Sequence, residues 1–210
     1  MKTLYLVRHG KSEANDKNIY QRKETPLSKE GIEQAYILQK RFLHIPIDIL
    51  YSSSLKRARE TAKIINEELK LPIHTTELVN EWGKPSSLLD LSIDGEGAKE
   101  FRSKLASHKG DPYWKWKDEE SMGELRDRIV QFLEKMKKDS KDNILIVTHS
   151  LSLKMMLSVV LFGPKSLPFN DVESFNVHTT NTGITVFQLE DGKENWKLVT
   201  WNDHAHLGEL

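Results

Sequence analysis

Residues 47–69, IDILYSSSLKRARETAKIINEEL, predict a strand joined directly to a helix. Ile47–Leu50 is a short apolar run of strand length. Downstream, apolar residues follow the three-four spacing of one helical face: Leu55, Ala58, Ala62, Ile65 and Leu69. Ser54, just before that face, is a residue type that caps helix N-termini. A strand that leads straight into a helix is the repeating unit of an α/β protein.

Two further apolar runs of strand length lie far from this segment along the chain. Thr3–Val7 stops at Arg8, and Ile144–Val147 stops at Thr148. A helix is predicted after each run, and the one after the second run begins near Leu151. The helix after the first run begins at Lys29, and its expected buried face comprises Ile32, Ala35, Tyr36, Phe42 and Leu43.

The C-terminal half adds a capped helix and a hairpin. Ser121 and Glu124 have the spacing of a capping box at the start of a helix. The apolar stripe of that helix comprises Met122, Leu125, Ile129, Phe132 and Met136. Ile184–Leu189 and Trp196–Thr200 flank Asp191-Gly192, which is a hairpin turn signal. This hairpin would place antiparallel strands at an edge of the sheet.

The alternation of strands and helices predicts an α/β fold, a three-layer α/β/α sandwich with a mostly parallel central sheet and an antiparallel edge. No repeat, low-complexity tract or linker interrupts the chain, so residues 1–210 are expected to form a single domain. Residues 78–118 mix Gly, Pro, Ser and Asp with tryptophans, and we expect loops and short helices there.

Charge and cysteine content exclude several classes of protein. The chain has 31 Lys plus Arg and 31 Asp plus Glu, so its formal net charge is zero. This balance argues against nucleic acid or a membrane surface as the main partner, since both favour a basic excess. The sequence contains no Cys, which excludes a disulfide scaffold, a thiolate nucleophile and a Cys-ligated zinc or iron–sulfur site.

No targeting or membrane segment is predicted. The apolar run Leu4–Val7 is too short for the core of a secretion signal. The most apolar stretch, Met155–Phe162, is far shorter than the ~20 residues that cross a bilayer. We therefore expect a cytoplasmic protein, and no pattern in the sequence specifies its oligomeric state.

Charged and titratable side chains follow all three predicted parallel strands. Arg8 and His9 follow the first, Arg57 lies in the helix after the second, and His149 ends the third. Ligands of open α/β sheets bind at the carboxyl ends of the strands, so these groups are expected to converge there. Guanidinium groups match phosphate oxygens in pairs, and two of them with two imidazoles would suit a phosphate dianion. The alternative for each His alone is a structural, hydrogen-bonded residue at a strand end.

The same residues carry a family resemblance over nearly the whole chain. Leu6-Val7-Arg8-His9-Gly10 resembles the signature of the histidine phosphatase superfamily, whose members are phosphoglycerate-mutase-like. The later blocks that resemble the family are Asn15, Pro26-Leu27-Ser28 with Gly31, residues 52–62 around Arg57, Glu119-Glu120-Ser121 with Arg128, and Val147-Thr148-His149. The resemblance implies a phosphoglycerate-mutase-like fold.

Three positions depart from the family's pattern. Lys11 stands where Glu or Gln is usual, which would make the rim of the pocket more positive. Ser150 replaces a Gly after the second His and brings a hydroxyl to the site. The block that carries the acid, Glu81-Trp82-Gly83-Lys84, matches more loosely than the others.

The resemblance implies a phosphohistidine mechanism without a metal ion or a cofactor. His9 would be the nucleophile, with one ring nitrogen unprotonated and the other donating to a carbonyl. Arg8, Arg57 and a protonated His149 would surround the phosphoryl oxygens, and Glu81 would be the general acid and base. Further substrate-binding candidates are Ser12, Asn15 and Ser150, of which Ser12 and Asn15 could instead organise a turn.

The predicted function is a metal-independent phosphomonoester hydrolase acting on a small phosphorylated metabolite. We expect residues 78–118 to form an insertion that covers the substrate. The alternative is a phosphoglycerate mutase of the same family, although Tyr20-Gln21-Arg22-Lys23 lacks the stretch typical of those enzymes. A non-catalytic phosphate-binding module is disfavoured because such a module needs no nucleophile. A metallohydrolase is disfavoured because the His spacing is not that of metal ligands and the arginines would repel a cation.

Overall fold

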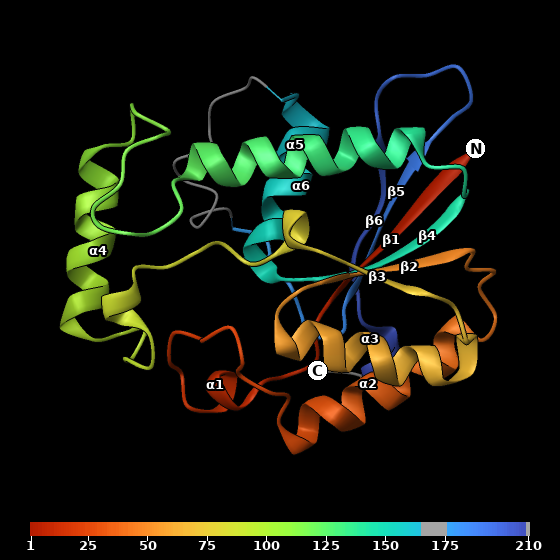
Figure 1. Cartoon of the computed structure of the whole chain (residues 1–210), viewed down its shortest axis with the longest axis horizontal. Coiled ribbons are helices and arrows are strands. Elements are labelled where there is room, and N and C mark those ends of the chain that lie inside the picture. The colour runs from red at the N-terminus through yellow and green to blue at the C-terminus, as the bar shows by residue number, and fades with distance from the viewer. Residues whose placement is uncertain (165–175, 209–210) are drawn as a thin grey trace.

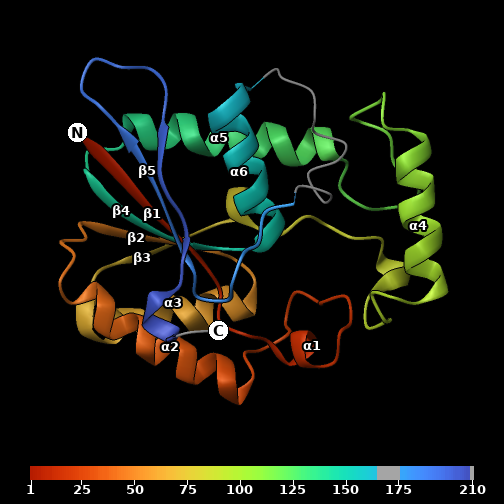
Figure 2. The ribbon, with the colours of Figure 1, turned by 180° about the vertical axis from the view of Figure 1, so that it is seen from behind.

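The computed structural model describes residues 1–164 and 176–208, whose strands form one six-stranded sheet. The strand order is β3-β2-β4-β1-β5-β6. The strands are β1 (Lys2–Arg8), β2 (Ile49–Ser53), β3 (Ile73–Thr76), β4 (Asn143–Thr148), β5 (Ile184–Leu189) and β6 (Lys197–Asp203). The first four strands run parallel, and β5 and β6 are antiparallel to their neighbours (Figure 2). The predicted mostly parallel sheet with an antiparallel edge is confirmed.

Helices cover both faces of this sheet, which gives the three predicted layers (Figure 1). The helices are α1 (Glu13–Asp16), α2 (Lys29–Phe42), α3 (Lys56–Leu69), α4 (Glu96–Ser107), α5 (Met122–Lys138) and α6 (Ser150–Phe162). On one face, α2 and α3 pack with the sheet around Phe42, Leu50 and Ile65. On the other face, α5 and α6 enclose a core that includes Phe132 and Met156. No helix in the described ranges is long and apolar enough to cross a membrane.

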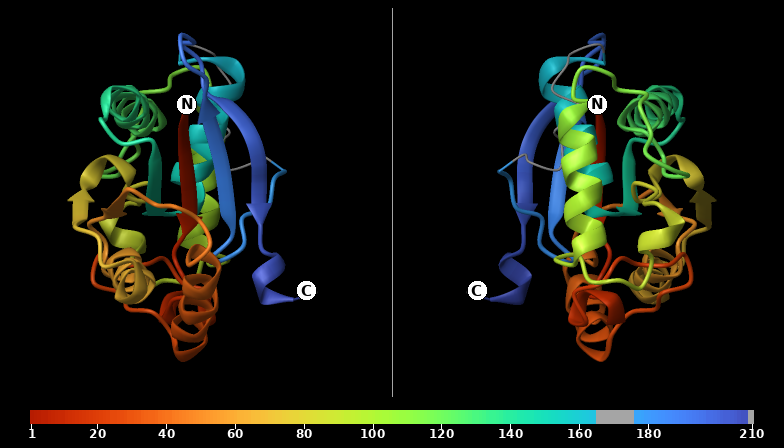
Figure 3. Two further views of the ribbon diagram at one scale, coloured as in Figure 1. Left: turned by 90° about the vertical axis from the view of Figure 1, so that its right-hand side faces the viewer. Right: turned by 90° about the vertical axis from the view of Figure 1, so that its left-hand side faces the viewer.

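The segment between β3 and α5 extends beyond the layers at one end of the molecule (Figure 1; Figure 3, right). It contains the short 3₁₀ turns Glu77–Val79 and Ser86–Leu88 and the helix α4. We expected only loops and short helices here, but α4 is 12 residues long. Its buried residues Ala98 and Phe101 pack in the same core as Trp82. The strand β3 was also not predicted, because His74, Thr75 and Thr76 carry no apolar strand pattern.

The expected buried face of α2 is wrong in part. Ala35 and Phe42 are buried, but Ile32, Tyr36 and Leu43 are exposed to solvent. The buried face also contains Gly31, Leu38 and Gln39. The first turn of α2 closely approaches the loop after β1: a Cβ on Gly10 would lie 2.4 Å from the carbonyl oxygen of Gly31. Packing at Gly31 therefore rotates the helix away from the face that apolar residues alone would select.

Two boundaries around β2 also differ from the prediction. The strand is Ile49–Ser53 rather than Ile47–Leu50, so its serines continue the ladder beyond the apolar run. Ser54 is not the N-cap of α3: Leu55 holds that position without a side-chain hydrogen bond. The amide and hydroxyl of Ser54 donate instead to Oδ1 of Asn80, at 2.9 and 3.0 Å. In contrast, the predicted capping box of Ser121 and Glu124 is present at the start of α5.

Candidate active site

His9 lies directly after β1 and is almost completely buried, with 2% of its surface exposed. Its Nδ1 lies 2.7 Å from the carbonyl oxygen of Gly10. A carbonyl can only accept, so this contact places the proton on Nδ1 and leaves the lone pair on Nε2. The structure thus supplies the carbonyl that a nucleophilic imidazole requires. Nε2 accepts a hydrogen bond from Nε of Arg57 at 3.2 Å.

Arg57, in the first turn of α3, is tied to the loop after β1. Its guanidinium also donates to the carbonyl of Arg22 at 3.2 Å. One helical turn later, the hydroxyl of Thr61 donates to the carbonyl of Arg57 and accepts from the amide of Gly10. Thr61 therefore fixes the start of α3 against the loop that carries His9.

Arg8 and His149 complete the group of buried cations and imidazoles. The Arg8 guanidinium donates to the carbonyl of Thr179. His149, which is fully buried, lies with its ring 5.0 Å from that of His9, and its Nε2 contacts the Ser53 hydroxyl at 2.7 Å. Arg8 Nε and His149 Nδ1 are buried and have no hydrogen-bond partner within the described residues.

Burial and nearby guanidiniums set the charge state of these groups. The pKa of His9 is held well below its usual value, first by burial and then by Arg57 and Arg8. The pKa of His149 is also well below its usual value, mainly through burial and then through Arg57. Burial lowers the pKa of Arg57 to about 10. These low pKa values favour the neutral form of both imidazoles at neutral pH.

Glu81 lies at the N-terminus of α6 and is fixed there by backbone donors. Its Oε1 accepts from the amides of Trp82, Leu151 and Ser152 at 3.0 to 3.3 Å. These amides fix the position of the carboxyl group. Glu81 is half-buried, and three amides bind its carboxyl group, so it is not a carboxylate that only solvent contacts.

A cavity of about 550 Å³ opens beside this cluster. Arg57 and Glu81 line it, together with Asn15 and apolar side chains that include Tyr20 and Trp82. His9, Arg8 and His149 do not line it. The structure therefore brings the five predicted catalytic residues together: Arg8, His9, Arg57, Glu81 and His149. Of these, Arg57 and Glu81 line the cavity, and His9 lies buried next to Arg57.

Three other predicted positions have local partners. Ser12 is fully buried and caps α1, where its hydroxyl and amide bond with Asn15. Of this pair, only Asn15 lines the cavity. The Ser150 hydroxyl lies 2.7 Å from that of Thr179.

Lys11 does not make the rim of the cavity more positive. Its ammonium lies 2.8 Å from Asp16 and 2.6 Å from Glu30, so two carboxylates offset its charge. These hydrogen bonds raise the pKa of Lys11 above its usual value.

Sequence reasoning missed several residues that hold the predicted ones. The Asn181 side chain donates to the carbonyl of His9 at 2.8 Å, and the amide of Thr182 donates to the carbonyl of Arg8. Thr179 and Ser53 contact Arg8 and His149, as described above. The signals were weak, since these are polar residues before β5 and at the end of β2. In the ranges that the structure describes, no group of three or more His, Asp or Glu side chains is arranged to hold a metal ion.

A comparison with protein families identifies the chain. The sequence model of the histidine phosphatase superfamily, branch 1, matches residues 4–204. The chain belongs to the histidine phosphatase superfamily. It is a phosphatase of this superfamily, and the family expected from the sequence blocks is confirmed.

Relatives of this histidine phosphatase cover its full length. A protein of Hydrogenobacter thermophilus named "Putative phosphoserine phosphatase 2" is 34% identical over 221 residues, covering 100% of both chains. A mutant phosphoserine phosphatase from Entamoeba histolytica, solved in complex with phosphoserine, has 25% identity and a TM-score of 0.80, with 99% and 100% of the chains covered. YhfR of Bacillus stearothermophilus has the same fold, with a TM-score of 0.82, 22% identity and coverage of 99% and 100%.

Proposed function

We propose that this histidine phosphatase hydrolyses a small phosphomonoester through a phosphohistidine on His9, without a metal ion. The observation that supports the proposal is a group of guanidinium and imidazole nitrogens around His9, two of which have no hydrogen-bond partner in the described part of the chain. Among the residues that the structure describes, Arg8 Nε is a buried donor without a partner, which is costly. His149 Nδ1 also has no partner among them. Because His149 Nε2 donates to the Ser53 hydroxyl, which itself donates to Asn80, Nδ1 becomes a donor when the ring is protonated. The third group is the Arg57 guanidinium, which contacts His9 Nε2. Phosphoryl oxygens would satisfy all three.

In the first step, His9 Nε2 attacks phosphorus while the ester P–O bond breaks. The N–P bond forms, and the leaving oxygen takes a proton from the Glu81 carboxyl group. Arg57 now occupies Nε2, so the substrate dianion must draw this guanidinium onto its oxygens before attack. Arg8, Arg57 and His149 then stabilise the charge on the transferring phosphoryl group.

In the second step, water replaces the alcohol. Glu81 takes a proton from the water, the water oxygen bonds to phosphorus, and the N–P bond breaks. Inorganic phosphate leaves, His9 returns to its neutral form, and Glu81 carries the proton for the next cycle.

The substrate is proposed to be a small phosphorylated metabolite such as phosphoserine. A cavity of about 550 Å³ suits a small molecule. The names of the Hydrogenobacter and Entamoeba proteins support phosphoserine as the first compound to test. Within a single domain of residues 1–210, we propose that 78–118 covers the substrate and selects the alcohol, because Trp82, Leu89 and Ile93 line the cavity.

Phosphate release from p-nitrophenyl phosphate, in buffer containing EDTA, tests the mechanism. Wild-type protein should turn over, and His9→Ala with an unchanged circular dichroism spectrum should not. Ordinary turnover by His9→Ala, or loss of wild-type activity in EDTA, would contradict the proposal. A panel of phosphometabolites that includes phosphoserine then identifies the substrate, and 3-phosphoglycerate tests the mutase alternative through formation of its isomer.

A further inference from the structure

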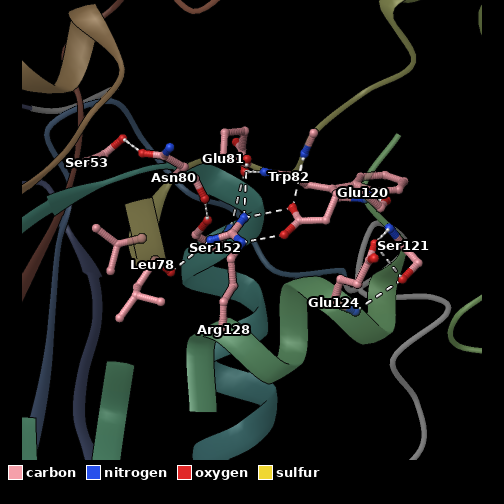
Figure 4. Close-up of polar contacts among 12 residues, drawn as sticks. Ser53, Leu78, Asn80, Glu81, Trp82, Glu120, Ser121, Glu124, Arg128 and Ser152 are labelled. Carbon is pink, nitrogen blue, oxygen red and sulfur yellow. Dashed lines mark hydrogen bonds and ion pairs between the residues drawn. The ribbon is translucent and has the colours of Figure 1, made fainter. Parts of the chain in front are cut away.

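The loop that carries Glu81 is held from α5 by one arginine. The Arg128 guanidinium donates to the carbonyls of Leu78 and Glu81, at 2.9 and 3.3 Å (Figure 4). The same group makes a two-pronged ion pair with the Glu120 carboxylate through Nε and Nη2. The Arg128 guanidinium thus binds the backbone at both Leu78 and Glu81.

Glu120 extends this grip past Glu81 on the other side. Its amide donates to the carbonyl of Gly83 at 2.9 Å, and its carboxylate accepts from the amide of Gly83 at 3.2 Å. Its carbonyl accepts from the indole N–H of Trp82. The Arg128–Glu120 pair therefore has contacts at residues 78, 81, 82 and 83.

The rest of the loop is fastened to the strand end that supports His149. The Ser53 hydroxyl, which contacts His149, donates to Oδ1 of Asn80 at 2.7 Å. The Ser152 hydroxyl donates to the carbonyl of Asn80. The backbone on each side of Glu81 is thus fixed. Together with the amides of Leu151 and Ser152 that bind the carboxyl group, these anchors set its direction.

We infer that Arg128 and Glu120 are positioning residues that aim the Glu81 carboxyl group at the leaving oxygen; this inference rests on the proposed function of Glu81 as the general acid. Neither residue transfers a proton. Side chains of both are only 15% and 20% exposed, so water does not replace their contacts freely. A lysine cannot reproduce the planar fork, and small displacements of an acid reduce proton transfer steeply.

Leaving-group dependence separates this role from a merely structural one. Phenyl phosphate and p-nitrophenyl phosphate are similar in size, but phenolate is the more basic leaving group and needs protonation more. The ratio of their kcat/KM values therefore reports the acid. We expect Arg128→Lys and Glu120→Gln to lower kcat/KM for phenyl phosphate about tenfold more than for p-nitrophenyl phosphate.

A matched control is Arg41→Lys. Arg41 makes a two-pronged ion pair with Asp203 that is somewhat more exposed, at 31% and 28%. Neither of these residues lines the cavity, whereas Arg128 and Glu120 do. This variant should keep the wild-type ratio. Thermal unfolding of each variant confirms that the assayed protein is folded. If folded Arg128→Lys lowers kcat/KM equally for both substrates, the inference is wrong.

A double-variant cycle shows whether Arg128 acts through Glu81. Glu81→Gln alone should lower the ratio, and adding Arg128→Lys should then leave the ratio unchanged. If Arg128→Lys lowers the ratio equally in both backgrounds, it does not act through Glu81 and the inference is wrong. If Glu81→Gln alone keeps the wild-type ratio, the assigned acid is wrong, and both the proposed function and the inference fail.

Discussion

Lowering the pH from 7.5 to 5.5 should destabilise this protein through two buried imidazoles, His9 and His149. Both have a folded-state pKa well below the ordinary value of 6.5, with burial as the largest cause. The unfolded chain protonates these histidines as the pH falls below 6.5, whereas the folded protein does not. Folding stability is therefore retained above pH 6.5 and lost below it.

The size of the effect follows from that difference in proton binding. A histidine that stays neutral when folded loses about 1.4 kcal/mol of stability between pH 7.5 and 5.5. His9 and His149 lose about 2.8 kcal/mol together. Burial also lowers the pKa of His206 to about 4, so this residue adds a further, smaller loss because it is partly exposed to solvent. Carboxylates add little in this range because they titrate mainly at lower pH.

Urea unfolding at pH 7.5, 6.5 and 5.5, followed by tryptophan fluorescence, measures this loss. His9→Ala should reduce the loss between pH 7.5 and 5.5 by about 1.4 kcal/mol, whatever its stability at pH 7.5. His44→Gln is the control, since His44 is exposed and should not affect the slope. An unfolding free energy equal at pH 7.5 and 5.5 would show that the folded protein binds as many protons as the unfolded chain, and would refute the lowered pKa of these imidazoles.

Three substitutions test the geometry directly. Gly10→Ala should destabilise the protein by about 3 kcal/mol in urea unfolding, because its Cβ would lie 2.4 Å from the carbonyl oxygen of Gly31; a loss under 0.5 kcal/mol would disprove the close approach. Ser121→Ala should remove about 1 kcal/mol through the lost cap of α5, measured the same way, while kcat/KM stays at the wild-type value. Arg57→Ala should reduce kcat for p-nitrophenyl phosphate by roughly 10² to 10³, and a loss below tenfold would exclude Arg57 from stabilising the transferring phosphoryl group.

The sheet and the convergence of the main polar residues were predictable because both depend on local sequence. Short apolar runs identified β1, β2 and β4. The polar residues that follow each run were then placed at the carboxyl end of its strand. The capping box at Ser121 depends on a spacing of three residues, so it was also predicted correctly. Parallel strands bring their carboxyl ends to one edge, which is enough to bring His9 near His149.

The remaining features depend on contacts between distant segments, which a local pattern does not contain. The buried face of α2 follows from the approach of Gly31 to Gly10, and apolar spacing alone selects the wrong face. Ser54 has the chemistry of an N-cap, but Asn80 takes its hydrogen bonds. Lys11 was expected at a positive rim, but Asp16 and Glu30 flank it in space.

The same long-range contacts explain how a chain of zero net charge can hold a positive site. The Arg57 guanidinium and the imidazoles of His9 and His149 are buried together, and Arg8 beside them is partly buried. The charges of Lys11 and Arg128 are offset by their carboxylate partners. In the proposed mechanism the attraction for a dianion comes from Arg8 and Arg57, and the charge of Arg57 is poorly screened because this residue is buried. Burial thus has two consequences for the proposed mechanism: it lowers the pKa of His9, as a neutral nucleophile requires, and it would strengthen the interaction of Arg57 with the phosphoryl group.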